Sequence, residues 1–176
     1  GRSRDDAGRW FGGNNSNPLW HFVLGDHYLR RNPHVAAHTA RVAVPEQAGK
    51  SRVYPRMPVP ERFNTPSDAS RLTSACSFAV YRDTLLGPAF SGDLFFCEPS
   101  HGLVHRQTPT PSGVTFTSRR APGEEDTEFL ASSDPWFRPT MVRTGPDGAL
   151  WVADMARFVI EHPEWIPDEW EKRLDL

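Results

Sequence analysis

The sequence has few cysteines, no long hydrophobic run and no excess of positive charge. Only two of its 176 residues are cysteines, and they form neither a C-x-x-C redox pair nor a C-x-x-C-H haem attachment motif. No apolar run approaches the roughly 20 residues of a membrane-spanning helix, and the N-terminal stretch lacks the charged-then-apolar pattern of a signal peptide. The formal net charge of -2 leaves no basic stripe for a phosphate backbone. We therefore expect neither a membrane span nor a nucleic-acid partner.

Proline, glycine and aromatic residues are abundant. The chain has 17 prolines and 13 glycines, which is high for a helical protein. Its 6 tryptophans and 11 phenylalanines are too many for a disordered one. Short strands joined by many turns are therefore expected within one domain. The chain has no starting methionine and a strand-like "RWFGG" follows almost at once, which is typical of a piece of a longer protein.

One structural unit is repeated along the sequence. The segments "FFCEPSHGLVHR" (95–106) and "WVADMARFVIEH" (151–162) align without gaps, and Glu98 falls on Asp154. Each segment has an aromatic-led strand, an acidic residue, a four-residue link and a second apolar strand, which begins at Leu103 or Val159. A further strand precedes each segment, in "SACSFAVYRD" and "PTMVRTG", and the second of these is joined through an Asp-Gly turn that favours a hairpin.

A fainter copy, "RWFGGNNSNPLWHFVL", lies near the start of the chain. Antiparallel hairpins that recur every 40 to 60 residues or so are typical of propeller blades, so we predict an all-β propeller of about three blades with a short C-terminal helix. A plain β-sandwich is the alternative fold. The predicted parts are a first blade (about 8–31), a long connection (32–71), a second blade (72–120), a third blade (134–163) and the terminal helix (167–176).

Hairpin pairing places the two cysteines opposite each other. Counting inward from each end of the loop "TLLGPAFSGD" sets Cys76 about opposite Cys97, and cross-strand neighbours lie within disulfide reach. We therefore predict a disulfide, with two buried free thiols as the alternative. A disulfide would indicate an oxidising compartment such as a periplasm.

Several long motifs resemble a known family. The stretches "GRWFGGNNSNPLWHFVLGDHYLRRNP", "FFCEPSHGLVHR", "SSDPWFRPTMVRTGPDGALWVADM" and "VIEHPEWIPDEW" are similar to the planctomycete-type membrane-bound dehydrogenase domain. That domain is a six-bladed propeller related to soluble pyrroloquinoline-quinone (PQQ) sugar dehydrogenases, and this chain resembles its later half. The resemblance implies a periplasmic or secreted bacterial protein that oxidises a sugar or alcohol with bound PQQ. It also implies that Arg138, with Arg143 as a lesser candidate, contacts the quinone.

The repeat places one polar residue per blade at the same height of the expected channel. These residues are Asn14 or Asn15, then Glu98, then Asp154, and such hard oxygen ligands suit Ca²⁺ or another divalent metal. The alternative is that the two carboxylates cap the backbone of adjacent loops.

Two further side chains near this rim are candidates for chemistry. His101 suits a general base or a metal ligand, because an unperturbed imidazole titrates near neutral pH, although an ordinary solvated histidine is the alternative. Arg157 could bind an anionic oxygen of the cofactor or cover a tryptophan face. The predicted catalytic residues are therefore His101, Asp154 and Arg138.

Three hypotheses for function follow. The first is a PQQ-dependent dehydrogenase-like fragment, and the second is a divalent-metal-dependent hydrolase of lactones, esters or phosphotriesters. The third is a non-catalytic binding module. Because three blades leave two apolar blade faces open, we also predict a homodimer that completes a six-bladed ring around a small-molecule substrate.

Overall fold

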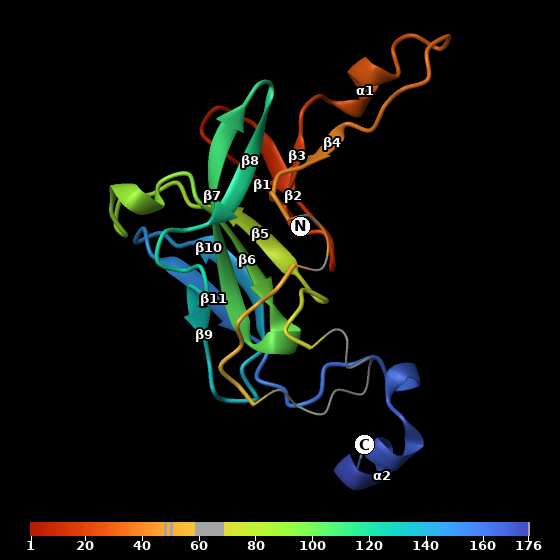
Figure 1. The fold of residues 1–176 in the computed structure, drawn as a ribbon, viewed down its shortest axis with the longest axis vertical. Helices are drawn as coiled ribbons and strands as arrows, with labels where there is room; N and C mark the ends of the chain where they lie inside the picture. Colours follow the sequence, from red (N-terminus) through yellow and green to blue (C-terminus); the bar gives the residue numbers. More distant parts are fainter. Residues whose placement is uncertain (48, 50, 59–68, 176) are drawn as a thin grey trace.

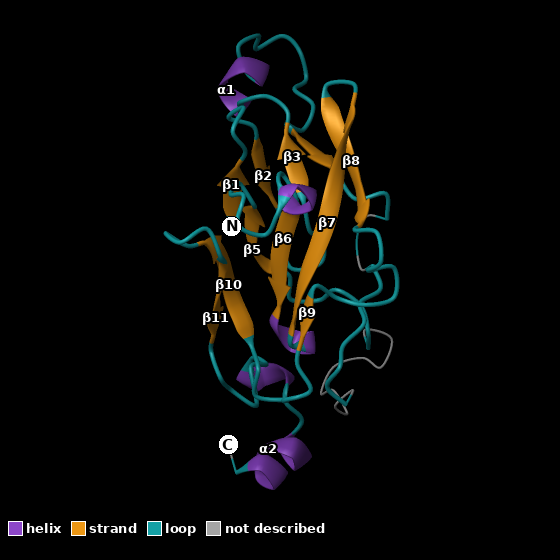
Figure 2. Ribbon diagram, turned by 90° about the vertical axis from the view of Figure 1, so that its left-hand side faces the viewer, coloured by secondary structure: helices purple, strands orange, loops and turns teal. Residues whose placement is uncertain are grey.

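The structure, a computed structural model, describes residues 1–47, 49, 51–58 and 69–175 and consists mainly of antiparallel β-sheet (Figure 1). Two short α-helices are present, α1 (Asp26–Leu29) and α2 (Asp168–Leu174), and both views place them at opposite ends of the long axis (Figures 1 and 2). The all-β class and the short C-terminal helix are thus confirmed. No helix among the described residues is long and apolar enough to cross a membrane.

The strands form three sheets. The first sheet has the order β1-β2-β3-β4, the second β5-β6-β7-β8 with β9 paired to β7, and the third β10-β11. Within the described residues, 3₁₀ turns at Pro88–Phe90, Pro99–His101 and Pro163–Trp165 lie in the connections. The strands are β1 (Arg2–Arg4), β2 (Trp10–Gly12), β3 (Trp20–Phe22), β4 (Arg41–Ala43), β5 (Cys76–Val80), β6 (Leu94–Glu98), β7 (Leu103–Ser112), β8 (Thr115–Arg120), β9 (Leu130–Ala131), β10 (Pro139–Thr144) and β11 (Leu150–Asp154).

The second sheet lies between the other two, so both of its faces are buried. Because side chains alternate along a strand, β6 sends Phe96 to one face and Phe95 and Cys97 to the other. The first face packs against Phe11 and Leu19 of the N-terminal region, and the second packs against the β10-β11 hairpin. Burial on two faces explains why β5 and β6 are nearly continuous apolar runs.

The hydroxyl of Ser77 joins the second and third sheets. Ser77 sits where the β5-β6 register shifts and has a φ of 52°, in the left-handed region. Its Oγ accepts a hydrogen bond from the backbone N of Val142 at 2.8 Å and another from Arg143 at 3.1 Å. The irregularity therefore turns a polar group of β5 onto the backbone of β10.

The hairpin predictions are confirmed in their register. Cys76 pairs with Cys97 across β5 and β6, and β10 pairs with β11 around the predicted turn. Gly148 in that turn has a φ of +82°, and a Cβ there would lie 2.6 Å from the carboxylate of Asp83. Glycine is therefore required at this position by both backbone and space.

Two boundaries differ from the prediction. Residues 155–162 form no strand, so the predicted strand at Val159 is wrong; the carbonyls of Arg157 and Phe158 accept hydrogen bonds from Arg138 instead of pairing in a sheet. The first sheet runs from Arg2 to Ala43, so it begins before the predicted first blade and ends inside the predicted connection. Residues 48, 50 and 59–68 of that connection lie outside the described residues.

Candidate functional site

Arg138 is a buried clamp between two loops. Arg138 comes directly after a turn in which the side chain of Asp134 accepts a hydrogen bond from the backbone N of Trp136. Only 4% of Arg138 is exposed, and its guanidinium donates to four backbone carbonyls at 2.7 to 3.3 Å. The acceptors are the carbonyls of Pro99, Ser100, Arg157 and Phe158. The fork of donors on the guanidinium suits this arrangement, because it satisfies several carbonyls from one rigid plane.

Asp154 secures the end of β11 beside Arg138. Its Oδ1 accepts from the backbone N of Arg138 at 2.8 Å and from the backbone N of Ala156 at 2.9 Å. The backbone N of Met155 in turn donates to the carbonyl of Arg138. This is the capping alternative for a rim carboxylate, and Asp154 remains exposed to solvent.

Glu98 occupies the matching place at the end of β6 but is fully buried. Its carboxylate accepts from the backbone N of Ser74 at 3.0 Å, from the Ser74 hydroxyl at 2.6 Å and from Thr73 at longer range. Nδ1 of His101 lies 3.2 Å from the same carboxylate. Glu98 therefore joins the segment before β5 to the turn after β6, and it also caps backbone.

The predicted rim residues gather at one end of the molecule, and hydrogen bonds to the backbone, not a shared ligand, connect them. Arg138 contacts the carbonyls that directly follow Glu98, and Asp154 contacts Arg138. Asn15 joins the same end because its carbonyl accepts from Ala75, whereas the Asn14 side chain accepts from Asn17 within its own turn. Across the described ranges, no three His, Cys, Asp or Glu residues are placed to hold a metal ion together.

The other two predicted cofactor arginines differ from each other. Arg143 donates to Ser77 and to the carbonyls of Phe78 and Val142, so its guanidinium is bound to the β5-β10 junction. Arg157 is exposed, and its carbonyl is one of the groups that Arg138 binds. Arg138 and Arg143 are thus committed to backbone, and they do not fit the role of holding a quinone.

The cysteine pair is reduced in the structure. Both residues are free thiols, so the predicted disulfide is not formed there, although the two residues are direct cross-strand partners. A hydrogen bond from Cys97 lowers the pKa of Cys76, and the same contact together with burial raises the pKa of Cys97. Cys76 is only partly buried, so we expect it to react before Cys97.

A buried network that the repeat did not indicate lies on the second sheet. His105 Nδ1 is 2.7 Å from Glu128, whose other oxygen accepts from Arg120 at 2.8 Å and from the backbone N of Tyr54 at 2.9 Å. Burial raises the pKa of Glu128, but the bonds and charges of His105 and Arg120 outweigh it and hold that pKa below the usual range. No local motif joins His105 to Glu128, because the contact forms only when the loop after β8 folds back over β7.

The His105 ring does not present a free base to solvent. The ring is 1% exposed, and its Nε2 lies 3.3 Å from the amide nitrogen of Gln107, whose oxygen accepts from the Ser118 hydroxyl. A cavity of about 450 Å³ adjoins these groups. The network therefore forms one wall of a pocket and stabilises the loop that carries Glu128.

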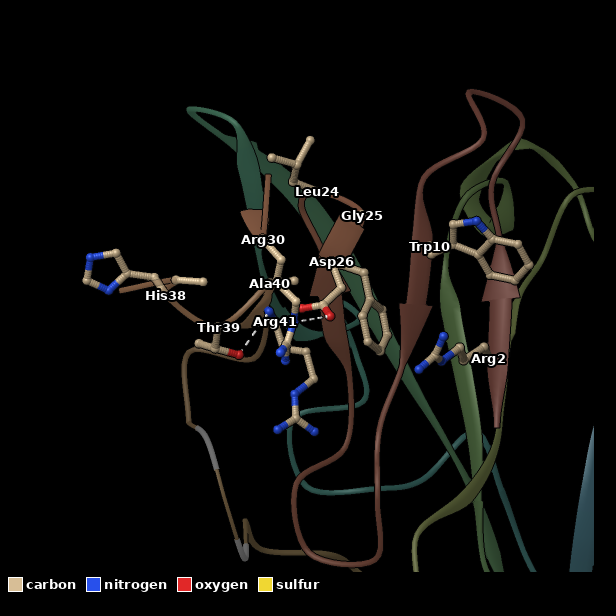
Figure 3. A pocket seen from close by; sticks show the side chains of 12 residues that line it. Arg2, Trp10, Leu24, Gly25, Asp26, Arg30, His38, Thr39, Ala40 and Arg41 are labelled. Carbon is tan, nitrogen blue, oxygen red and sulfur yellow. Dashed lines mark hydrogen bonds and ion pairs between the residues drawn. The ribbon is translucent and has the colours of Figure 1, made fainter. Parts of the chain in front are cut away.

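A large cavity lies on the outer face of the first sheet, far in sequence from Glu98, Arg138 and Asp154. Its volume is about 890 Å³. Figure 3 shows Arg41, Arg30 and Asp26 close together, with Arg2 and Trp10 across from them. No motif in the sequence indicated this site, because its residues come from four strands and the segment around α1. The lining residues used below are Arg2, Trp10, Phe22, Asp26, Thr39 and Arg41.

The fold and site define an all-β domain of stacked antiparallel sheets whose rim residues bind backbone. The chain belongs to the family described as Domain of unknown function (DUF7133), whose model matches residues 1–176. No curated protein and no solved structure matches the chain.

Proposed function

We propose that this chain is a non-catalytic ligand-binding domain built from propeller-type blades. The support for the blades is the packing order: three antiparallel sheets follow one another along the chain and stack face to face, each burying a face against the next. Successive blades of a propeller bury their faces in this manner. In this proposal the rim residues hold adjacent blades together.

One observation carries the proposal. Arg138 was expected to bind a quinone, and Glu98 was expected to bind a metal. Each side chain is instead hydrogen-bonded to several groups of the chain itself. Recruiting either one for a ligand would leave buried backbone groups without partners, at a cost of about 1–3 kcal/mol for each group. A binding role at other surfaces requires no such loss.

A quinone-dependent dehydrogenase of sugars or alcohols is the second candidate. The observation that favours it is the clustering of Arg138, Asp154, Glu98 and His101 at one end of the molecule. Bound PQQ would supply the hydride acceptor, and exposed Arg157 is the residue best placed to meet its carboxylates. A metal-dependent hydrolase receives no comparable support, because Glu98 is inaccessible.

Titration with PQQ and Ca²⁺ distinguishes these functions. We expect neither a shift in melting temperature nor dye reduction with sugars, for wild type and for Arg157→Gln alike. A ligand at 100 times its dissociation constant would add about 2.7 kcal/mol to stability, which a thermal melt detects readily. A PQQ-dependent rise in melting temperature that Arg157→Gln abolishes would overturn the proposal and support the dehydrogenase.

We also propose that two copies associate through the third sheet. Its outer face exposes Met141 and Trp151, which are 50% and 58% accessible. A second copy that packs its own third sheet against this face, about a two-fold axis, would cover both side chains and leave the outer face of the first sheet open.

A further inference from the structure

The outer face of the first sheet is an array of arginines and aromatic rings. In the register of β1 to β3, the alternate row Ser3, Phe11 and His21 faces the interior, where Phe11 and His21 are buried. The side chains between them must point outward, because neighbouring positions of a strand face opposite sides. The outward side chains are Arg2, Arg4, Trp10, Trp20, Phe22 and Arg41.

Each ring on this face is covered by a guanidinium. Cζ of Arg2 lies 4.5 Å from the centre of the Phe22 ring, Cζ of Arg41 lies 4.4 Å from that of Trp20, and Cζ of Arg4 lies 5.6 Å from that of Trp10. Stacking of this kind uses the flat face of the guanidinium and leaves its N–H edges directed outward. The rings therefore orient three sets of donors on one surface.

These three arginines have no carboxylate partner within the described part of the chain. Other exposed arginines do pair with carboxylates, as Arg30 does with Asp26 at 2.5 Å in the adjoining cavity and Arg119 does with Glu46 at 3.1 Å. Three unpaired guanidiniums on one face of a chain with a net charge of -2 form a local positive patch. Charge complementarity indicates a ligand that carries several oxyanions.

The cavity beside the patch supplies other kinds of contact. Thr39 and Asp26 line it with groups that bind hydroxyls, and Trp10, which is 45% exposed, lines it with an aromatic surface. Its volume of about 890 Å³ is at the upper end of the range for small-molecule sites. An extended chain of sugar rings offers anionic groups, hydroxyls and apolar C–H faces together.

We propose that the outer face of β1 to β4, with its adjoining cavity, binds a linear anionic polysaccharide. This inference rests on the proposed role as a binding domain and names its ligand. Arg2, Arg4 and Arg41 bind the carboxylate or sulfate groups, since guanidinium edges match planar or tetrahedral oxyanions. Trp10 packs against the C–H face of a sugar ring.

A polysaccharide fits better than a nucleic acid. Single-stranded nucleic acids stack successive bases on several open aromatic faces, whereas guanidiniums lie over the Phe22 and Trp20 rings and leave Trp10 as the exposed ring of this face. Asp26 in the cavity wall is paired with Arg30 at 2.5 Å, and its carboxylate can still accept hydrogen bonds from sugar hydroxyls. A nucleic acid is therefore an outcome of the test and not the expectation.

The test measures binding of polygalacturonate, dextran sulfate and neutral dextran to the full chain by calorimetry. We expect at least one polyanion to bind and neutral dextran not to bind. Affinity should fall on the order of tenfold between about 50 and 200 mM salt, because binding releases counterions. The double variant Arg2→Gln/Arg41→Gln should lose about tenfold or more in affinity, and the charge-matched control Arg119→Gln/Arg173→Gln should retain it.

A second pair of variants removes aromatic surface. Trp10→Ala should weaken binding, whereas Trp136→Ala, an exposed tryptophan outside this sheet, should not. The inference is overturned if neither polyanion binds, if the two double variants behave alike, or if an oligothymidylate binds more tightly than both polysaccharides. None of these results depends on PQQ, so a failure here is distinct from a failure of the non-catalytic proposal.

Discussion

Replacing Arg138 with methionine tests whether the predicted rim is a structural clamp. The side chain donates to carbonyls from two loops, one after β6 and one after β11, and is almost fully buried. Methionine has a similar length and apolar body but no donors. The substitution therefore removes the hydrogen bonds with little change in packing volume.

The magnitude follows from which carbonyls can be rehydrated. Arg157 and Phe158 are exposed residues, so water can replace the guanidinium at their carbonyls. Pro99 is buried and Ser100 half-buried, so their carbonyls would lose a partner at about 1–3 kcal/mol each. We expect Arg138→Met to lower the free energy of unfolding by about 3–5 kcal/mol, measured by urea denaturation followed by circular dichroism.

Two further variants make this result specific. Arg157→Met is the matched control, because it removes an exposed guanidinium from one of the clamped loops, and its effect should stay within about 0.5 kcal/mol. Arg138→Lys should recover little, since a single ammonium cannot reach carbonyls on both loops. If the urea midpoint of Arg138→Met were close to that of wild type, the clamp role would be refuted, and Arg138 would again be a candidate ligand-binding residue.

The remaining predictions concern the thiols, a buried carboxylate and association. Mild oxidation should join Cys76 to Cys97 and stabilise the protein by about 3 kcal/mol, because the disulfide closes a loop of roughly 20 residues. Before oxidation, iodoacetamide should label Cys76 before Cys97. Equal labelling of the two thiols, measured by mass spectrometry, would contradict the hydrogen bond between them. Since the folded-state pKa of Glu128 lies below its usual 4.5, its contribution to stability is present above about pH 4.5 and lost as the pH falls through the folded pKa, so Glu128→Gln should show a flatter acid dependence of melting temperature than wild type. Light scattering should give a dimer that Trp151→Glu dissociates and Trp136→Glu does not; a monomeric wild type would remove the proposal of association through the third sheet.

Local patterns in the sequence determined much of the second and third sheets. Apolar segments that recur along the chain and are bounded by turn residues identified β5, β6, β10 and β11, and the Asp-Gly turn set the register of one hairpin. The same counting placed Cys76 opposite Cys97. These features depend on interactions between near neighbours in a hairpin, which leave a readable period and turn chemistry.

Only the tertiary structure decided what the polar residues do. The alignment of Glu98 with Asp154 correctly placed each at the end of a strand, but whether these carboxylates face a channel or the backbone depends on how loops from distant parts of the chain fold onto them. Likewise, residues around Val159 have the composition of a strand, yet their carbonyls are taken by Arg138. A hydrogen bond between segments far apart in sequence leaves no local period, so neither these roles nor the contact of His105 with Glu128 could be inferred before the sheets were stacked.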